Sequence, residues 1–127
     1  MADSKKYEVR VEVVTQYLPD QSEPEANRYT FAYHIKVINS GSVPSQLISR
    51  HWVITDAAGE VQEVRGLGVV GHQPLLQPAQ EFEYTSGCVL ATPVGSMRGS
   101  YQFTAEDGTQ FEAPIVEFVL SMPRVLH

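Results

Sequence analysis

The chain has 127 residues, of which 43% are hydrophobic and 19% are charged. This length and composition are typical of a small globular protein, and we expect residues 1–127 to form a single domain. Its 15 acidic and 9 basic residues give a formal net charge of −6. That charge repels phosphate backbones and argues against a nucleic-acid partner.

Cysteine content and hydropathy indicate a cytoplasmic protein. Cys88 is the only cysteine, so an internal disulfide is impossible. The N-terminal residues contain no apolar stretch resembling a signal peptide, and no window approaches the ~20 apolar residues of a membrane span. We therefore expect no membrane partner.

Alternation of apolar and polar residues with a period of two predicts β-strands along the chain. The first strand is expected in residues 7–13, and a polar loop containing two prolines follows in residues 18–27. Residues 29–37 show the clearest alternation. A turn follows over residues 39–42.

The third strand, residues 46–55, has an ambiguous inner face. Ile48, Trp52 and Ile54 share one side with Arg50, whereas Leu47 and Val53 share the other with His51. We expect Trp52 to point inward, because the large aromatic ring buries more area than the two aliphatic side chains. A hairpin then leads to residues 61–65.

Residues 66–80 form an unusually long connection with three glycines and two prolines. Because the segment is also rich in leucine and valine, we expect it to be ordered and packed over one end of the domain. Further strands are expected in residues 81–86, 97–104 and 110–120. Seven short strands without helical periodicity predict an all-β, immunoglobulin- or fibronectin-III-like antiparallel sandwich of two sheets.

Three glycines of this connection match the dinucleotide-binding pattern G-x-G-x-x-G: Gly66, Gly68 and Gly71. Pyrophosphate binding requires a helix directly after the glycines, and Pro74 and Pro78 interrupt any helix here. No acidic residue lies near position 91 to bind a ribose. We expect the glycines to shape a loop, with at least one at positive φ, while a backbone nest for an anion is the weaker alternative.

Candidate ligands for a metal are too few and too widely spaced. The four histidines are His34, His51, His72 and His127. They lack the spacing of zinc ligands, and Cys88 has no cysteine nearby, so neither a metal nor another cofactor is expected. His34 and His51 could face each other if their strands were adjacent.

A catalytic constellation is also not apparent. The chain has no G-x-S-x-G nucleophile elbow, and the apolar neighbours of Cys88 predict a buried, inert thiol. Tyr101 is a candidate for the tyrosine corner of immunoglobulin-like sandwiches, which is a structural role. We therefore do not expect an enzyme.

Several longer runs resemble the bacterial ApaG family over nearly the whole chain. They are Asn27-Arg28-Tyr29-x-Phe31-Ala32-Tyr33, Ser49-Arg50-His51-Trp52-x-Ile54-Thr55-Asp56, Gly68-Val69-Val70-Gly71-x-Gln73-Pro74, Tyr84-Thr85-Ser86-Gly87, Thr92-Pro93-x-Gly95-x-Met97-x-Gly99-x-Tyr101 and Pro123-Arg124-x-Leu126-His127. The resemblance implies an immunoglobulin- or fibronectin-III-like sandwich without an established enzymatic activity. It also implies a family-level link to cobalt resistance and magnesium efflux, and similar domains in F-box proteins and a DNA polymerase delta-interacting protein are thought to mediate protein contacts.

Two positions depart from the family pattern. Leu67 stands where an acidic residue is common, which weakens the case for a metal ligand in the glycine segment. Ala79 replaces the glycine of a Pro-Gly turn, which suggests that this turn does not require positive φ.

These observations favour a non-enzymatic module that binds an unknown protein partner, as a monomer or weak homodimer. Its surface would comprise the 66–80 segment and the Arg50-His51 end of the third strand. The alternative is a small-ligand site for a nucleotide or phosphorylated metabolite at Gly66–Gly71, and an enzyme of unknown type ranks third. The candidate binding residues are Arg50, His51, Arg65, Gly66, Gly68, Gly71 and His72.

Overall fold

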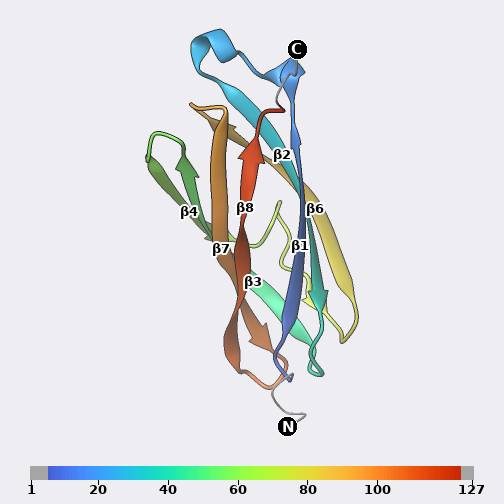
Figure 1. Ribbon diagram of the computed structural model, residues 1–127. Helices are drawn as coiled ribbons and strands as arrows, with labels where there is room; N and C mark the ends of the chain where they lie inside the picture. The colour runs from blue at the N-terminus through green and yellow to red at the C-terminus, as the bar shows by residue number, and fades with distance from the viewer. Residues whose placement is uncertain (1–5, 124–127) are drawn as a thin grey trace.

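Eight antiparallel strands form two sheets that pack face to face (Figure 1). The computed structural model describes residues 6–123. The three-stranded sheet has the order β1-β2-β6, with β1 Val9–Tyr17, β2 Tyr29–Asn39 and β6 Glu81–Leu90. The five-stranded sheet has the order β4-β3-β7-β8, and β5 also pairs with β3. Its strands are β3 Ser45–Asp56, β4 Val61–Leu67, β5 Leu75–Leu76, β7 Val94–Ala105 and β8 Gln110–Ser121.

The predicted sandwich is confirmed, and seven of its strands are those expected from the alternation. The eighth, β5, lies in the segment predicted to be a loop. β1 continues beyond its predicted end to Tyr17, whose ring packs against Phe31 of β2 at a centroid distance of 5.3 Å. Two short 3₁₀ turns, η2 Pro19–Gln21 and η3 Pro24–Ala26, occupy the β1–β2 connection.

Trp52 points into the core, as predicted, and only 2% of it is exposed. Its ring makes edge contacts with Tyr33 of the opposite sheet, at 5.5 Å between centroids, and with Tyr101 and Phe118 at 6.3 and 5.9 Å. Aromatic pairs prefer such edge-to-face geometry. The indole ring therefore contacts aromatic side chains of both sheets.

A β-bulge corrects the prediction that Leu47 lies on the outer side with His51. Leu47 pairs with Phe103 and Ser49 with Gln102, so Ile48 is an extra residue on β3. The bulge reverses the alternation at this point. Leu47 and Trp52 are consequently both buried, although an uninterrupted strand would place them on opposite faces.

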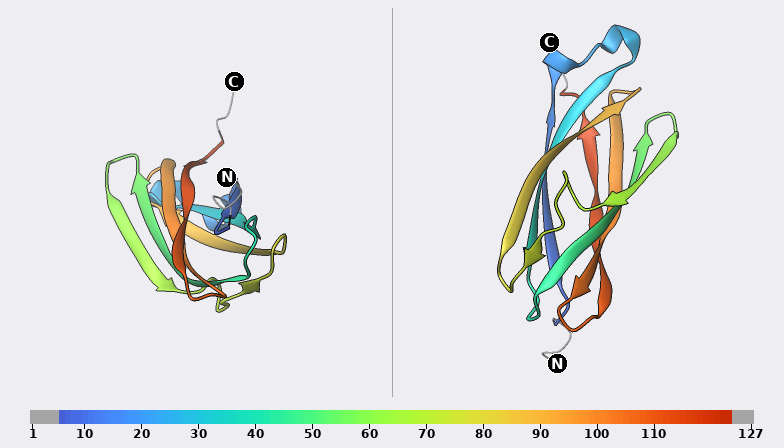
Figure 2. Two further views of the ribbon diagram at one scale, coloured as in Figure 1. Left: turned by 90° about the horizontal axis from the view of Figure 1, so that it is seen from below. Right: turned by 180° about the vertical axis from the view of Figure 1, so that it is seen from behind.

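The sandwich is closed along one side and more open along the other. β1 packs beside β8 on the closed side. On the other side the free edges are β4 and β6, and the segment after β4 crosses from one to the other (Figure 2, right). This segment was expected over one end of the domain, but it spans the open side because Val69 is buried between the sheets.

Replacing Trp52 with alanine should reduce the free energy of unfolding by about 3–5 kcal/mol, because it removes a buried aromatic side chain from the contact between the sheets. Urea denaturation measures the change. Val116→Ala is the matched control, since Val116 is 84% exposed and should change stability very little. Equal midpoints for the two variants would contradict the central role of Trp52.

Candidate functional site

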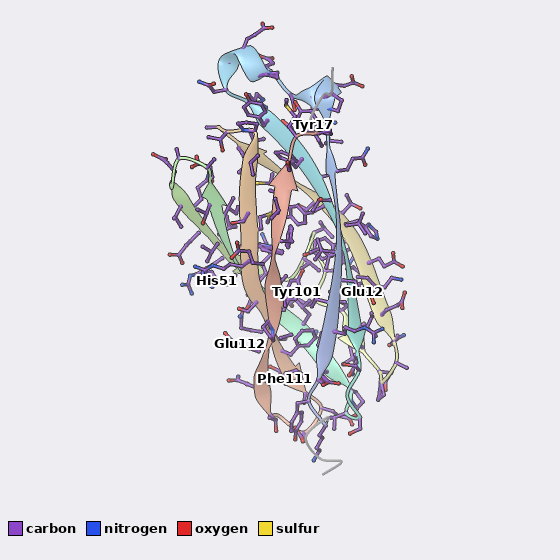
Figure 3. The ribbon with its side chains drawn as sticks, in the orientation of Figure 1. Glu12, Tyr17, His51, Tyr101, Phe111 and Glu112 are labelled. Carbon is purple, nitrogen blue, oxygen red and sulfur yellow. The ribbon has the colours of Figure 1, made fainter. Side chains whose placement is uncertain are left out.

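The outer face of the five-stranded sheet contains a shallow depression of about 500 Å³ at the junction of β3 and β4. It is lined by Ser49, Arg50, His51, Arg65, Gly66, Leu67, Gln102 and Glu112. Pairing of β3 with β4 places Arg50 opposite Gly66 and His51 opposite Arg65. Four of the seven candidate residues therefore lie around one depression, and Figure 3 labels His51 and Glu112 on this face.

A carboxylate joins the two basic side chains of this face. Glu63 Oε1 accepts a hydrogen bond from His51 Nε2 at 2.9 Å and lies 3.4 Å from Arg65 Nη2. The hydrogen bond from His51, with a smaller contribution from Arg65, holds the pKa of Glu63 below its usual value. Glu63 is thus ionised at neutral pH and partly neutralises the basic pair.

The depression continues across β7 to β8. Ser49 Oγ donates to Gln102 Oε1 at 2.7 Å, and Gln102 Nε2 donates to Glu112 Oε2 at 3.2 Å. An adjoining hollow of about 630 Å³ shares these three residues and extends to Ile48 and Phe111. The outer face therefore has a polar centre formed by these three side chains.

Arg50 belongs to the rim of this depression, but its guanidinium group lies on the inner side of the sheet. Arg50 pairs with the fully buried Tyr101, and both sit in the inward row of Trp52. Nη1 donates to the carbonyl oxygens of Leu67 at 3.1 Å and Gly68 at 2.8 Å. The side chain is thereby held at the open side of the sandwich.

Two adjoining cavities surround this guanidinium group, with volumes of about 260 and 360 Å³. Both are lined by Tyr33, Arg50, Trp52 and Ser86. The smaller extends beneath the 68–74 crossing, and the larger opens between β4 and the C-terminal half of β6. We call the two cavities together the inter-sheet groove. The sequence pattern does not reveal the groove, because the period of two marks Tyr33 and Trp52 only as core residues.

The three glycines of the G-x-G-x-x-G pattern have separate structural roles. A Cβ atom on Gly66 would lie 2.9 Å from both terminal nitrogens of Arg50, so the missing side chain makes room for the guanidinium group. Gly68 and Gly71 have φ of 63° and 83°, which confirms that at least one glycine is at positive φ. At Gly68, a Cβ atom would also collide with the backbone carbonyl of His72.

Backbone hydrogen bonds occupy several N–H groups that an anion-binding nest would need. Gly68 N donates to Ile48 O at 2.8 Å. Val69 N donates to His72 O, and His72 N donates to Val69 O, both at 2.8 Å. These two bonds close a tight turn at Val70 and Gly71, both of which have positive φ. These N–H groups are thus used for bonds within the chain, which does not favour the alternative of a nucleotide site at Gly66–Gly71.

The remaining histidines lie apart from the depression. His72 packs against Phe82 at a centroid distance of 5.7 Å, on the side of β6. His34 is on the outer face of the other sheet and bonds to Thr85 and Glu83. It does not face His51, because β2 and β3 belong to different sheets. His127 lies outside the described residues.

Metal and nucleophile chemistry find little support in the part of the chain that the structure describes. No group of three His, Cys, Asp or Glu residues within 6–123 could hold a metal ion. Burial raises the pKa of the Cys88 thiol to about 11, so the reactive thiolate is scarce at neutral pH. Within the same residues, no helix is long and apolar enough to cross a membrane.

Two smaller predictions are wrong. Tyr101 does not form a tyrosine corner, because its hydroxyl bonds to Tyr84 Oη at 2.5 Å instead of to the backbone. Ala79 has a φ of 73°, so the turn after Pro78 does require the left-handed conformation. Hydrogen bonds from Ala79 N to Asn39 O and from Gln80 N to Gln77 O hold it there.

Alanine substitutions at Gly68 and Gly71 should distinguish two effects on stability: the collision of a Cβ atom with the His72 carbonyl and the strain of a positive φ. Both residues have positive φ, but a Cβ atom at Gly71 meets nothing within 4 Å. We expect Gly71→Ala to cost about 1 kcal/mol and Gly68→Ala to cost clearly more, with altered amide shifts in residues 66–74. Urea denaturation and amide spectra provide the measurements. Equal costs would show that the close approach to His72 is unimportant.

Similarity to known sequences and structures identifies the family of the chain. The sequence model described as "DUF525: ApaG domain" matches residues 19–105. The chain is 63% identical to Protein ApaG of Aromatoleum aromaticum and 64% identical to that of Nitrosospira multiformis, in each case over 127 residues and the full length of both chains. A crystal structure of an ApaA protein from Bordetella pertussis superposes with a TM-score of 0.92 at 57% identity, covering 95% of this chain and 98% of the other. The chain belongs to the ApaG family.

Proposed function

We propose that the chain is a non-enzymatic binding module whose partner is another protein, bound through β4 and the adjacent outer face. The observation that carries this proposal is the exposure of β4. Six of its seven residues are exposed, and its outer edge pairs with no strand among residues 6–123. Free strand edges are established sites for the addition of an extended polypeptide.

The hydrogen-bond pattern identifies which backbone groups of β4 are free. Asp56 N donates to Glu60 O, and Gly68 N donates to Ile48 O. Bonded pairs alternate along an antiparallel ladder, so Gln62, Val64 and Gly66 direct their backbone groups toward β3. Val61, Glu63 and Arg65 consequently direct theirs away from the sheet.

The side chains of β4 add to this case. Val61 is 58% exposed and Leu67 75% exposed, and Leu67 lines the outer depression. The pairing of β4 with β3 runs without a bulge, and the strand contains no proline. Bulges and prolines are common devices that block edge pairing. Their lack in β4 supports strand addition by a partner.

The alternative, a nucleotide at Gly66–Gly71, leads to a separate expectation. Because the turn uses its own N–H groups and the chain carries a net charge of −6, ATP and NAD should bind weakly or not at all. An amide chemical-shift titration tests this. Saturable shifts confined to residues 65–73, with a dissociation constant well below about 1 mM, would favour the nucleotide site instead.

A proline at position 63 should abolish partner binding without breaking the sheet. Glu63→Pro removes an N–H group on the free edge, whereas the bonds to β3 come from neighbouring positions. Glu63→Thr is the matched control, because it also loses the contacts with His51 and Arg65 but keeps the N–H group. Peptides selected from a random display library against the wild-type protein serve as ligands.

We expect Glu63→Pro to weaken the selected peptides at least about tenfold and Glu63→Thr to change their affinity less than about twofold. Urea denaturation checks that both variants are folded. Equal affinities for the two variants, or peptide-induced amide shifts confined to the outer face of the three-stranded sheet, would contradict strand addition at β4.

A further inference from the structure

The inter-sheet groove contains a positive charge that no neighbouring carboxylate neutralises. Arg50 Nη1 is bonded to two carbonyl oxygens, and no carboxylate oxygen of residues 6–123 lies within 4.0 Å of the guanidinium group. The side chain packs over Gly66, which fixes its position. Nη2 and Nε have no hydrogen-bond partner among the same residues. The guanidinium group is therefore held in place by Nη1, while the N–H groups of Nη2 and Nε remain free to donate hydrogen bonds.

Phenol groups around Arg50 do not supply the missing negative charge. Burial raises the pKa of Tyr84 to about 12 and also raises those of Tyr33 and Tyr101, so all three phenols are neutral at physiological pH. In the bond between Tyr84 and Tyr101 only one hydroxyl donates. The other hydroxyl hydrogen has no acceptor among the described residues. The guanidinium group of Arg50 is therefore the charged donor at this end of the groove.

The rest of the groove combines apolar and polar groups. Trp52, Ile54 and Val64 line the larger cavity together with Val89 of β6. Small-ligand sites are typically about 300–1,000 Å³, apolar, with a few polar groups that fix orientation. The cavity of about 360 Å³ falls at the lower end of this range, and the cavity of about 260 Å³ lies just below it.

Backbone strain at the mouth of the groove is a second, independent observation. Val70 has a φ of 42°, a conformation that β-branched residues rarely adopt. The residue lines the smaller cavity and is 52% exposed. The turn closed by Val69 and His72 holds it there. Strained residues of this kind concentrate at binding sites.

We propose that the inter-sheet groove binds a small organic monocarboxylate, with the carboxylate on Arg50 and an apolar body against the exposed side chains of Val64 and Val89. This site goes beyond the proposed protein contact at β4 and lies on the opposite side of the sheet from the outer depression. A carboxylate matches the flat donor fork of a guanidinium group, and its single charge matches the single cation. A phosphate dianion would require more positive charge than the groove provides.

Trp52 makes the site directly measurable, because it is the only tryptophan in the chain. Phenylacetate is the test ligand, phenylacetamide is the neutral analogue of the same shape, and inorganic phosphate is an anion without an apolar body. We expect phenylacetate to produce a saturable change in tryptophan fluorescence. Phenylacetamide should bind at least about tenfold more weakly, and phosphate should produce no saturable change.

Two variants locate the site. Arg50→Met keeps an apolar stem and removes the cation, so it should lose phenylacetate binding. Arg65→Met makes the same change on the outer face and should bind like the wild-type protein. If circular dichroism shows that Arg50→Met is poorly folded, Ser86→Leu provides a second test. Ser86 lines both cavities, so a larger side chain there should occupy part of the groove and weaken phenylacetate binding.

Several results would overturn the proposal. One is the lack of a saturable signal from the wild-type protein up to about 20 mM phenylacetate. Another is equal binding of phenylacetate and phenylacetamide. A third is an equal loss of binding in Arg50→Met and Arg65→Met. Amide shifts at residues 50–54 and 84–89 should accompany the fluorescence change, and shifts confined to the outer face would count against the groove.

Discussion

One extra residue in β3 determines how both sheets and both candidate surfaces are arranged. The bulge at Ile48 allows Leu47 and Trp52 to enter the same core. It also fixes the alternation that follows, so Arg50 faces inward and His51 faces outward. A regular strand in this place would bury either Leu47 or Trp52 but not both. The face of the sheet on which each side chain of β3 lies is therefore a consequence of its packing.

Glycine usage in the β4–β5 segment depends on the same arrangement. Gly66 accommodates the inward Arg50 side chain, and Gly68 allows the chain to approach His72 closely. The pattern G-x-G-x-x-G is thus explained by contacts within the sandwich. Its spacing coincides with the nucleotide fingerprint, but the helix that gives the fingerprint its chemistry is replaced by a turn bonded to itself.

The sequence was sufficient to predict the all-β sandwich and the inward Trp52, but it left open whether Arg50, His51, Arg65 and His72 converge in space. Alternation and the size of the indole ring carry the first two predictions. The bulge at Ile48 could not be predicted, since no local residue pattern marks it. The wrong predictions for Ala79 and Tyr101 have a related cause. Hydrogen bonds to distant residues decide each of them: Asn39 fixes the turn at Ala79, and Tyr84 binds the hydroxyl of Tyr101.

The left-handed valine at position 70 has a consequence for protein engineering. Glycine or asparagine would adopt this backbone conformation with less strain, so substitution there is a route to a more thermostable chain. The same substitution would remove an exposed aliphatic side chain from the mouth of the groove. A more stable turn and an exposed aliphatic side chain at the mouth of the groove therefore place opposite demands on position 70.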